Sequence, residues 1–509
     1  MAGPPVPNEG PIQGSKAAIT VLVMAAVLMA MIDISIINVA LSDIRASFGT
    51  PIDQIGWVST GYMMANIVVI PMTGWLQRRF GFRKYYATSV LIFTIASALC
   101  GTAWNLPALV VFRILQGMGG GAIIPTSQAI LFSRYPRAQH GMAAALFGLG
   151  AITGPLLGPT IGGYLIEWSS WHWIFLVNVP IGLTVAFMIP RVIREPGFVA
   201  ERKPIDKVGI GLLAVGMASL QYCLEEGNRE GWGDSNLILG LGAVAATALI
   251  TFIFYELEAD NPVVDLRVFK NRSYAAGTGL NFLTGLALFG TSYLFSLYCG
   301  SVMHYTALQI GTIFLYAGAS QVFLMPMIGR LMPKVDVRLM LLLGVGVVTL
   351  SQFTATHLTQ DADFVHLLMP NLIRSLGLGF IFIPVSVAAL SDLPQHQRGN
   401  ATGLFNLTRE LGGSLGTAWM GTVVANGIAR HSSNLGEHVN IYDSTSQMQL
   451  AMHGAIDPIL GIANQVHTQA MVLSFEDGFR LTTIAILCGL FMVALLKKPK
   501  PGPAPAGAH

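Results

Sequence analysis

The sequence predicts an all-helical membrane protein whose chain crosses the bilayer fourteen times. Of its 509 residues, 53% are hydrophobic and only 11% are charged, and the mean hydropathy is +0.60. A soluble globular protein carries roughly a quarter of its residues as charged side chains. Because so little charge cannot coat the surface of a chain this long, we expect most of the surface to contact the lipid bilayer. The net charge of +3 gives no sign of a nucleic-acid partner.

Fourteen apolar segments are long enough to span a membrane. Their expected ranges are 17–40, 55–76, 86–104, 106–131, 141–166, 172–190, 207–225, 236–256, 273–298, 308–331, 338–356, 365–391, 400–427 and 477–496. No cleavage site follows the first segment, so we expect it to remain as a membrane helix. The four cysteines have neither the spacing of metal ligands nor that of a disulfide framework, and no metal site is expected.

The basic residues predict the orientation in the membrane. The tails and the loops after even-numbered spans hold 22 of the 29 Lys and Arg residues, whereas the opposite loops hold three. Because Lys and Arg accumulate on the cytoplasmic side, we expect both termini to be cytoplasmic. The tails at 1–16 and 499–509 are expected to be disordered.

The chain contains an internal repeat. Residues 139–163 match 397–421 at ten of 25 positions, and residues 71–83 match 326–338 at five of 13. The nearly constant offset predicts two homologous six-helix bundles, at 17–196 and 261–498, with two inserted helices at 197–260. Parallel halves of this kind are how alternating-access carriers are built, with the substrate site at their interface.

Several motifs resemble those of one family. Leu28 to Ile44 resembles a first-helix signature in which Asp33 falls on a marked position. Arg113, Gln116 and Gly117 are similar to the Arg-x-x-Gln-Gly motif of a fourth helix, and Gly150 to Gly163 is similar to an antiporter motif of a fifth. In these respects the chain resembles the fourteen-helix drug:proton antiporters of the major facilitator superfamily, the EmrB/QacA-like branch. The resemblance covers about 480 residues.

The resemblance implies a major facilitator fold and proton-coupled efflux of amphipathic or hydrophobic small molecules across a bacterial inner membrane. It implies the proton gradient as the driving force, with no cofactor. The alternative is a dedicated exporter of a siderophore or another natural product. A membrane enzyme or a non-transporting sensor is a remote alternative, because the sequence contains neither a convergent catalytic set nor a soluble signalling domain.

Asp33 and Arg113 are the candidate proton-coupling residues. Each lies about seven residues from the outer end of its expected span, so both are roughly 10 Å below the outer surface. Charges at this depth are costly and are functional by default, so we expect a cavity pair in which Asp33 carries the proton. The alternative is an ion pair that only locks two helices together.

Three further charges, Arg374, Arg409 and Glu410, are expected within the second bundle. Arg409 and Glu410 correspond to Ala151 and Ile152 of the first bundle, so the repeat carries these charges on one side only. They are expected to make the cavity polar, unless Glu410 simply neutralises one of the two arginines.

The fifth span carries small residues four positions apart. These form one stripe that allows close approach of a neighbouring helix, and the prolines beside them bend the helix. The resemblance implies a seal and hinge, with tight packing as the simpler alternative. The motif residues are Gly150, Gly154, Pro155, Gly158, Pro159 and Gly162.

Two segments outside the spans are also singled out. The first is an expected inner gate loop, for which a topology signal is the alternative; it contains Gly74, Arg78, Arg79, Gly81, Arg83 and Lys84. The superfamily loop usually has Asp at the position of Arg78, so that residue's role does not carry over. The second is a long polar periplasmic loop at 428–476, with helix-compatible runs at Ser444–Gly454 and Pro458–Leu473. It is expected to dock a periplasmic adaptor, and through it an outer-membrane channel, or else to form a surface cap.

Overall fold

The computed structural model describes residues 12–196, 198–200, 206–360, 362–391, 393–437 and 458–496, and helices dominate this part of the chain. The single β pairing among these residues is an isolated bridge between Gln13 and Arg194. The helices are α1 (Lys16–Phe48), α2 (Ile52–Ile55), α3 (Trp57–Cys100), α4 (Leu106–Arg134), η1 (Arg137–Gln139), α5 (His140–Trp168), α6 (Trp173–Leu176), α7 (Asn178–Val192), α8 (Lys207–Glu226), η2 (Trp232–Asp234), α9 (Asn236–Glu258), η3 (Leu266–Lys270), α10 (Arg272–Ser301), α11 (Ala307–Leu331), α12 (Val337–Ala355), α13 (Phe364–Leu390), α14 (Gln395–Glu437) and α16 (Pro458–Leu495).

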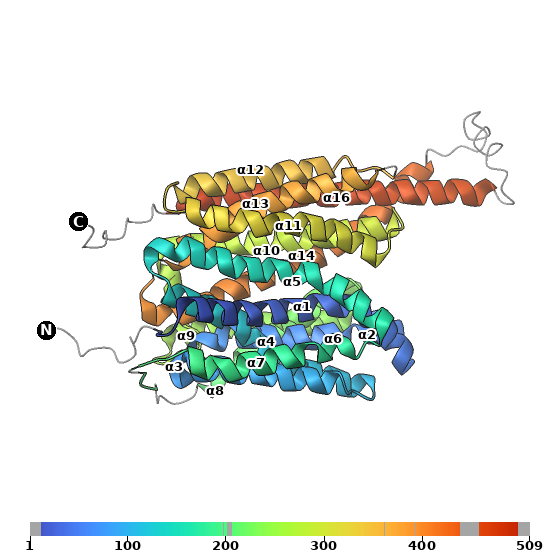
Figure 1. Ribbon diagram of the computed structural model, residues 1–509. Helices are drawn as coiled ribbons and strands as arrows, with labels where there is room; N and C mark the ends of the chain where they lie inside the picture. The colour runs from blue at the N-terminus through green and yellow to red at the C-terminus, as the bar shows by residue number, and fades with distance from the viewer. Residues whose placement is uncertain are drawn as a thin grey trace.

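The long helices run side by side in two groups, one around α1, α4 and α7 and the other around α10 to α13 and α16 (Figure 1). The internal repeat is visible in the packing. Gly154 and Gly158 of α5 face the backbone of α1, and their sequence equivalents Gly412 and Gly416 of α14 face the backbone of α10 in the same way. Equivalent glycines therefore join the first and fifth helices of each bundle.

Ten helical segments of the described chain are long and apolar enough to cross a membrane. Helices α3, α5 and α14 cover the other four ranges in which the sequence predicts spans. Large apolar side chains are exposed on the outside of the bundle, including Phe323 at 81% and Phe254 at 66%. Water does not tolerate an apolar surface of this extent on a monomer, so these side chains are placed to contact lipid.

Helix α3 consists of two arms that meet at Gly81, which has φ of 79° and ψ of 156°. Asn66 of the first arm and Phe93 of the second contact neighbouring turns of α4, at Gly121 and Gly119. Both arms therefore lie at the same level beside α4, and the chain reverses at Gly81. Glycine is suited to this position because its φ is in a region that side chains disfavour.

A carboxylate stabilises this reversal. Glu195 accepts hydrogen bonds from the backbone N–H groups of Phe82 (3.0 Å) and Arg83 (2.9 Å), at the start of the second arm. Burial raises the pKa of Glu195, while the two backbone amides oppose the rise. The expected loop between the second and third spans is thus a tight break inside α3 and not an extended loop.

Helices α8 and α9, the expected insertion, pack against each other at the side of the molecule. α8 contacts α3 and α14, whereas α9 contacts mainly α8 and the short helices η2 and η3. Along α9, Ile250 and Phe254 are among the exposed apolar side chains. The insertion therefore adds a lipid-facing layer to the two bundles.

The end of the molecule at which α1 begins and α16 ends (Figure 1) is called the basic end; it includes residues 76–84, 134–139, 193–196, 206–207, 259–272, 330–338 and 393–398. Three side-chain hydrogen bonds that join the two bundles lie toward this end. They link His140 to Ser391 (2.9 Å), Arg398 to Phe132 O (3.2 Å) and Asn406 to Gln128 (2.7 Å). Gly74 and Asn400 are also in backbone contact there. The two bundles are therefore held together at the basic end.

Two expected boundaries differ in the structure. α1 runs to Phe48, past the expected end at residue 40, so Asp33 lies near the middle of its helix. Residues 12–15 of the expected disordered tail are ordered, because Gln13 pairs with Arg194 and Ile12 is buried. The helix-compatible run expected at Pro458–Leu473 is confirmed, because α16 begins at Pro458 and continues into the last span, while α14 reaches Glu437. Ser444–Gly454 and the tail at 499–509 lie outside the described residues.

We expect the Gly158→Ala substitution to destabilise the protein. A Cβ at Gly158 would overlap the Ser35 hydroxyl and lie 3.0 Å from the Ile36 nitrogen. Overpacking of this kind costs about 1–3 kcal/mol. The measurement is the thermal midpoint of the purified protein in detergent. Gly163→Ala, on the same helix with nothing within 4 Å of its Cβ position, is the matched control and should be neutral or stabilising. Equal effects of the two substitutions would contradict the close packing of α5 on α1.

Candidate functional site

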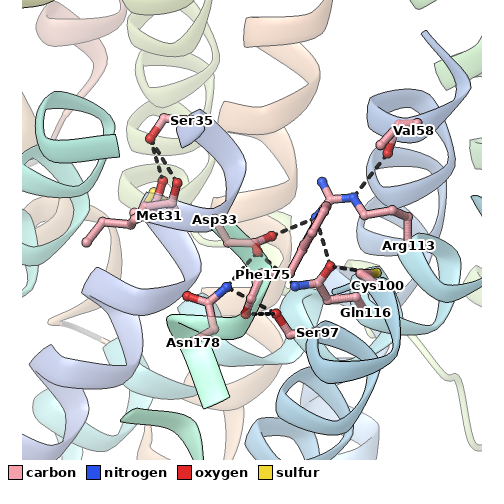
Figure 2. A network of polar contacts seen from close by, with 11 residues as sticks. Met31, Asp33, Ser35, Val58, Ser97, Cys100, Arg113, Gln116, Phe175 and Asn178 are labelled. Atoms are coloured by element: carbon pink, nitrogen blue, oxygen red, sulfur yellow. Dashed lines mark hydrogen bonds and ion pairs between the residues drawn. The ribbon is translucent and has the colours of Figure 1, made fainter. Parts of the chain in front are cut away.

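Polar side chains from three helices meet around Asp33 inside the first bundle (Figure 2). Asp33 is on α1, Arg113 and Gln116 are on α4, and Asn178 begins α7. Arg113 and Gln116 are three residues apart, so both project from the same face of α4. Asn178 follows the interruption between α6 and α7.

Three side chains donate hydrogen bonds to the Asp33 carboxylate. Arg113 Nη1 lies 2.8 Å from Oδ2, and both Gln116 Nε2 and Asn178 Nδ2 lie 2.8 Å from Oδ1. An ionised carboxylate can accept all of these bonds, and it supplies the counter-charge of the Arg113 guanidinium. The geometry therefore suits an ionised Asp33.

The Arg113 guanidinium is held on all sides. Its Nε donates to Val58 O (3.1 Å), and its Nη1 also donates to Gln116 Oε1 (2.8 Å). Its central carbon lies 4.3 Å from the centre of the Tyr62 ring. The cation–π contact and these hydrogen bonds together compensate the burial of the guanidinium. They orient Arg113 independently of its bond to Asp33.

The pair does not line a cavity, which corrects the expectation from the sequence. Asp33 and Arg113 are each 1% exposed, and all their hydrogen-bond partners belong to the first bundle. Removing two charges from water costs several kcal/mol per ion, so an ion pair persists here only because its remaining donors and acceptors are satisfied. In this conformation the charge is sealed from water.

Several partners of Asp33 were not predicted from the sequence. Gln116 was recognised only as part of a motif, and Asn178 only as part of an apolar segment. Ser97 was not singled out, although its hydroxyl lies 3.2 Å from Asn178 Nδ2 and donates to Phe175 O. The available signal was an amide within an otherwise apolar run, at Asn178, since such a group needs a buried partner.

The antiporter-motif glycines lie directly behind the turn of α1 that carries Asp33. Cβ atoms at Gly154, Gly158 and Gly162 would collide with Met31, Ser35 and Ile36, and one at Gly150 would lie 3.1 Å from Val27. The Ser35 hydroxyl is within 3.3 Å of Gly154 O. A Cβ at Gly311 of α11 would lie 3.9 Å from Pro159, while the side chain of Pro155 is outside the described part. The predicted stripe is therefore the contact surface for α1.

The three charges of the second bundle do not form one cluster with Asp33. Arg374 is 6% exposed and donates to Asn371, and its Nη1 has no hydrogen-bond partner. Arg409 is 4% exposed and lies 3.8 Å from Glu410, whose side chain is 21% exposed. The expectation that all three are cavity charges is therefore wrong for the two arginines, which are buried, whereas Glu410 keeps partial access.

The residues of the expected inner gate loop lie at the contact between the bundles. Gly74 touches Asn400 of α14, and Arg83 and Lys84 are exposed beside the break at Gly81. Arg78 and Arg79 line a cavity of about 210 Å³ together with acidic and amide side chains from the second bundle. The other lining residues are Trp75, Asp260, Asn261, Pro262, Asp265, Arg267, Gln397 and Asn400.

Comparison with known proteins gives a consistent result. The family model of the Major Facilitator Superfamily matches residues 23–417. The chain is 35% identical to the multidrug export protein EmrB of Haemophilus influenzae, over 96% of this chain and 97% of that protein. It is 33% identical to the fatty acid resistance protein FarB of Neisseria gonorrhoeae, over 96% and 98%. Among solved structures it resembles the human organic anion transporter MFSD10, with a TM-score of 0.62, 13% identity and coverage of 94% and 100%, a likeness of fold. The chain therefore belongs to the major facilitator superfamily and, within it, to the family of the EmrB multidrug export proteins.

Proposed function

We propose that this protein exports amphipathic or hydrophobic small molecules from the cytoplasm in exchange for protons. The observation that carries the proposal is the Asp33–Arg113 pair, sealed inside one of the two bundles of a carrier fold. The names of relatives such as the multidrug export protein EmrB support this substrate class over a dedicated siderophore or natural-product exporter. The proton gradient supplies the energy, and no cofactor takes part.

Protonation of Asp33 provides the coupling. When the carboxylate gains a proton it no longer carries the charge that balances Arg113, and its hydrogen bonds from Arg113, Gln116 and Asn178 weaken. Arg113 then remains buried without a counter-charge, which is unfavourable by several kcal/mol. Helices α1, α4 and α7 must shift to relieve this, so proton binding and conformational change occur together.

The position of the inter-bundle contacts assigns the conformation. The hydrogen bonds between the bundles lie toward the basic end, and we infer that this end faces the cytoplasm, as the distribution of Lys and Arg indicates. The structure then corresponds to a state closed to the cytoplasm. Export requires these contacts to open so that substrate can enter from that side.

The same inference gives the arrangement in the membrane. The chain is a fourteen-span protein of the inner membrane, with both termini cytoplasmic. The two bundles correspond to 17–196 and 261–498, and the insertion to 197–260. Glu410, which keeps partial access while Arg374 and Arg409 are buried, is the charge of the second bundle placed beside the substrate route.

The ends of α14 and α16 form a projection that we propose as the docking site for a periplasmic adaptor leading to an outer-membrane channel. α16 has 38 residues and is roughly 57 Å long at 1.5 Å per residue, about twice a bilayer core of roughly 30 Å. It extends beyond the other helices at the end opposite the basic end (Figure 1). Arg430 and His431 of α14 both contact Asp477 of α16, which stiffens the projection.

Asp33→Asn is expected to abolish efflux driven by the proton gradient while leaving the protein in the membrane. The substitution keeps the shape of the side chain but removes the group that takes up the proton. The measurement is uptake of a lipophilic fluorescent dye into inside-out vesicles across a range of pH. Asp43→Asn, an exposed carboxylate on the same helix, is the control and should transport normally. Transport by Asp33→Asn with an unchanged pH profile would exclude Asp33 as the proton carrier.

A disulfide between the bundles at the basic end should stop transport reversibly. In a chain whose four native cysteines are replaced, His140→Cys and Ser391→Cys introduce one thiol on each bundle. In the native protein the His140 ring nitrogen and the Ser391 hydroxyl are 2.9 Å apart. Oxidation is expected to block vesicle uptake, and a reductant should restore it. The control pair is His431→Cys with Asp477→Cys, which lies within the second bundle and should not block the opening. Full activity of the oxidised inter-bundle pair would rule out opening at this end.

Photo-crosslinking tests the projection. A photoreactive residue at the exposed position Gln469 of α16 should crosslink to a co-expressed adaptor of the EmrB family's export system. The control position is Phe491 on the same helix, which is 67% exposed on the apolar surface and should label only lipid or neighbouring helices. An adaptor that is captured equally from both positions, or from neither, would contradict docking on the projection.

A further inference from the structure

Two acidic side chains face each other at the basic end of the inserted helices, far along the chain from Asp33. Asp206 precedes the first residue of α8, and Glu256 is near the last residue of α9. Glu256 is 1% exposed. The Asp206 Oδ2 atom is likewise buried. Neither residue has a part in the proton-coupling site of the first bundle.

Three of the four carboxylate oxygens lack a hydrogen-bond partner in the described structure. Asp206 Oδ1 accepts from Gly209 N (2.8 Å) and Tyr255 OH (3.1 Å), which caps α8. By contrast, Asp206 Oδ2 and both carboxylate oxygens of Glu256 have no hydrogen-bond partner. Buried polar atoms without hydrogen-bond partners are rare. Three of them close together indicate a bound ligand that the protein's own groups do not supply.

The surrounding charges do not neutralise the pair. On α8, Lys207 is exposed, and on η3 the Arg267 guanidinium donates to the carbonyls of Leu257 and Ala259. Asp265, before η3, adds a further negative charge. The backbone amides of Val263 and Val264 lie near Glu256, but both of its carboxylate oxygens remain without a hydrogen bond of normal geometry. Two ionised carboxylates would therefore repel each other without compensation.

A glycine keeps the space between the two carboxylates open. A Cβ on Gly209 would lie 2.6 Å from Glu256 Oε1 and closer still to Asp206 Oδ2. Both oxygens therefore border the same small volume above Gly209, which a Cβ would fill.

We propose that Asp206 and Glu256 form a binding site for a single proton, held between Asp206 Oδ2 and a Glu256 carboxyl oxygen. One proton converts two repelling carboxylates into an acid–carboxylate pair with one strong O–H···O⁻ hydrogen bond. A metal ion fits less well, because Ca²⁺ needs about 6–8 oxygen ligands and Mg²⁺ about six. The described residues contain no group of three or more His, Cys, Asp and Glu side chains able to hold a metal.

The site is connected to the contact between the bundles. After α9 the chain passes through the buried residues Val263 and Val264 to Asp265, whose backbone exchanges two hydrogen bonds with the Asn400 side chain. Asn400 in turn touches Gly74 of the first bundle. The proton therefore stabilises the segment that supports the closed basic end. The inference does not depend on the identity of the transported substrate.

The test is the pH dependence of thermal stability in the full-length protein, purified in detergent without divalent cations. The unfolded chain releases its Glu protons above about pH 4.3. The folded pair retains one, so unfolding releases a proton and stability falls as pH rises. Between about pH 5 and about pH 9 we expect the pair to contribute a fall of about 2–4 °C in the thermal midpoint.

Two variants isolate the contribution of the pair. Glu256→Gln keeps a hydrogen-bond donor beside Asp206 at every pH. The pair's contribution to the fall in the thermal midpoint should therefore disappear, with little loss of stability. Asp206→Asn should also remove it, because the amide donates to ionised Glu256. The matched control is Glu258→Gln, an exposed carboxylate on the same helix, which should follow the wild type.

Two results would overturn the proposal. One is a thermal midpoint of Glu256→Gln that falls with rising pH as much as that of the wild type, across the whole pH range. The other is saturable restoration of the wild-type midpoint at high pH by Na⁺ or Mg²⁺, absent in Asp206→Asn, which would assign the site to a metal ion. An infrared band of a protonated carboxylic acid that is lost in Glu256→Gln and retained in Glu258→Gln would support the proton directly.

Discussion

The ion pair between Asp33 and Arg113 imposes the strictest constraint on this fold. A carboxylate sealed from water is stable only if hydrogen-bond donors surround it, and the structure supplies them from α4 and α7 at 2.8 Å each. This requirement explains why Gln116 follows Arg113 by three residues on α4. It also explains the interruption before Asn178, which turns the Asn178 amide inward. It also explains the glycines of α5, because side chains there would push the turn that carries Asp33 out of place.

The two bundles share their packing but not their chemistry. Gly154 and Gly158 of α5 and Gly412 and Gly416 of α14 bring equivalent helices into contact, so the duplicated architecture is maintained by the same small residues. Among the described residues of the second bundle, Arg374 is buried without a carboxylate partner, and the Arg409–Glu410 ion pair joins neighbours on a single helix. Duplication thus fixed the scaffold, whereas the sealed ion pair between helices is a feature of the first bundle.

Much of this structure could be predicted from the sequence, because hydropathy, basic residues and the repeat each act over many positions. The helical membrane fold, the paired bundles and the contact of Asp33 with Arg113 all follow from such patterns. The partners of Asp33 did not, since hydrogen bonds between α1 and α7 depend on three-dimensional packing that a single Asn or Ser in an apolar run does not reveal. The same holds for burial: membrane depth predicts that a charge is costly, but only packing determines whether water or protein surrounds it. The continuation of α14 to Glu437 was missed because its polar composition is unlike that of a span, whereas the helical run at Pro458–Leu473 was expected.

The position of α5 explains how the seal around Asp33 and the closure of the basic end can change together. One face of α5 contacts α1 at Met31 and Ser35, on either side of Asp33. The opposite side contacts the second bundle, where a Cβ at Gly141 would lie 2.7 Å from Met332 and one at Gly148 would lie 3.2 Å from Met325. These contacts leave no spare volume, and packed interiors respond to displacement by changing between discrete arrangements. When the second bundle moves away from the basic end, α5 cannot keep both surfaces in place. It either follows the second bundle and loosens the turn of α1 that carries Asp33, or stays and loses its contacts with α11. The first alternative gives Asp33 access to water only when the bundles move, which is the condition that obligatory exchange of a proton for a substrate requires.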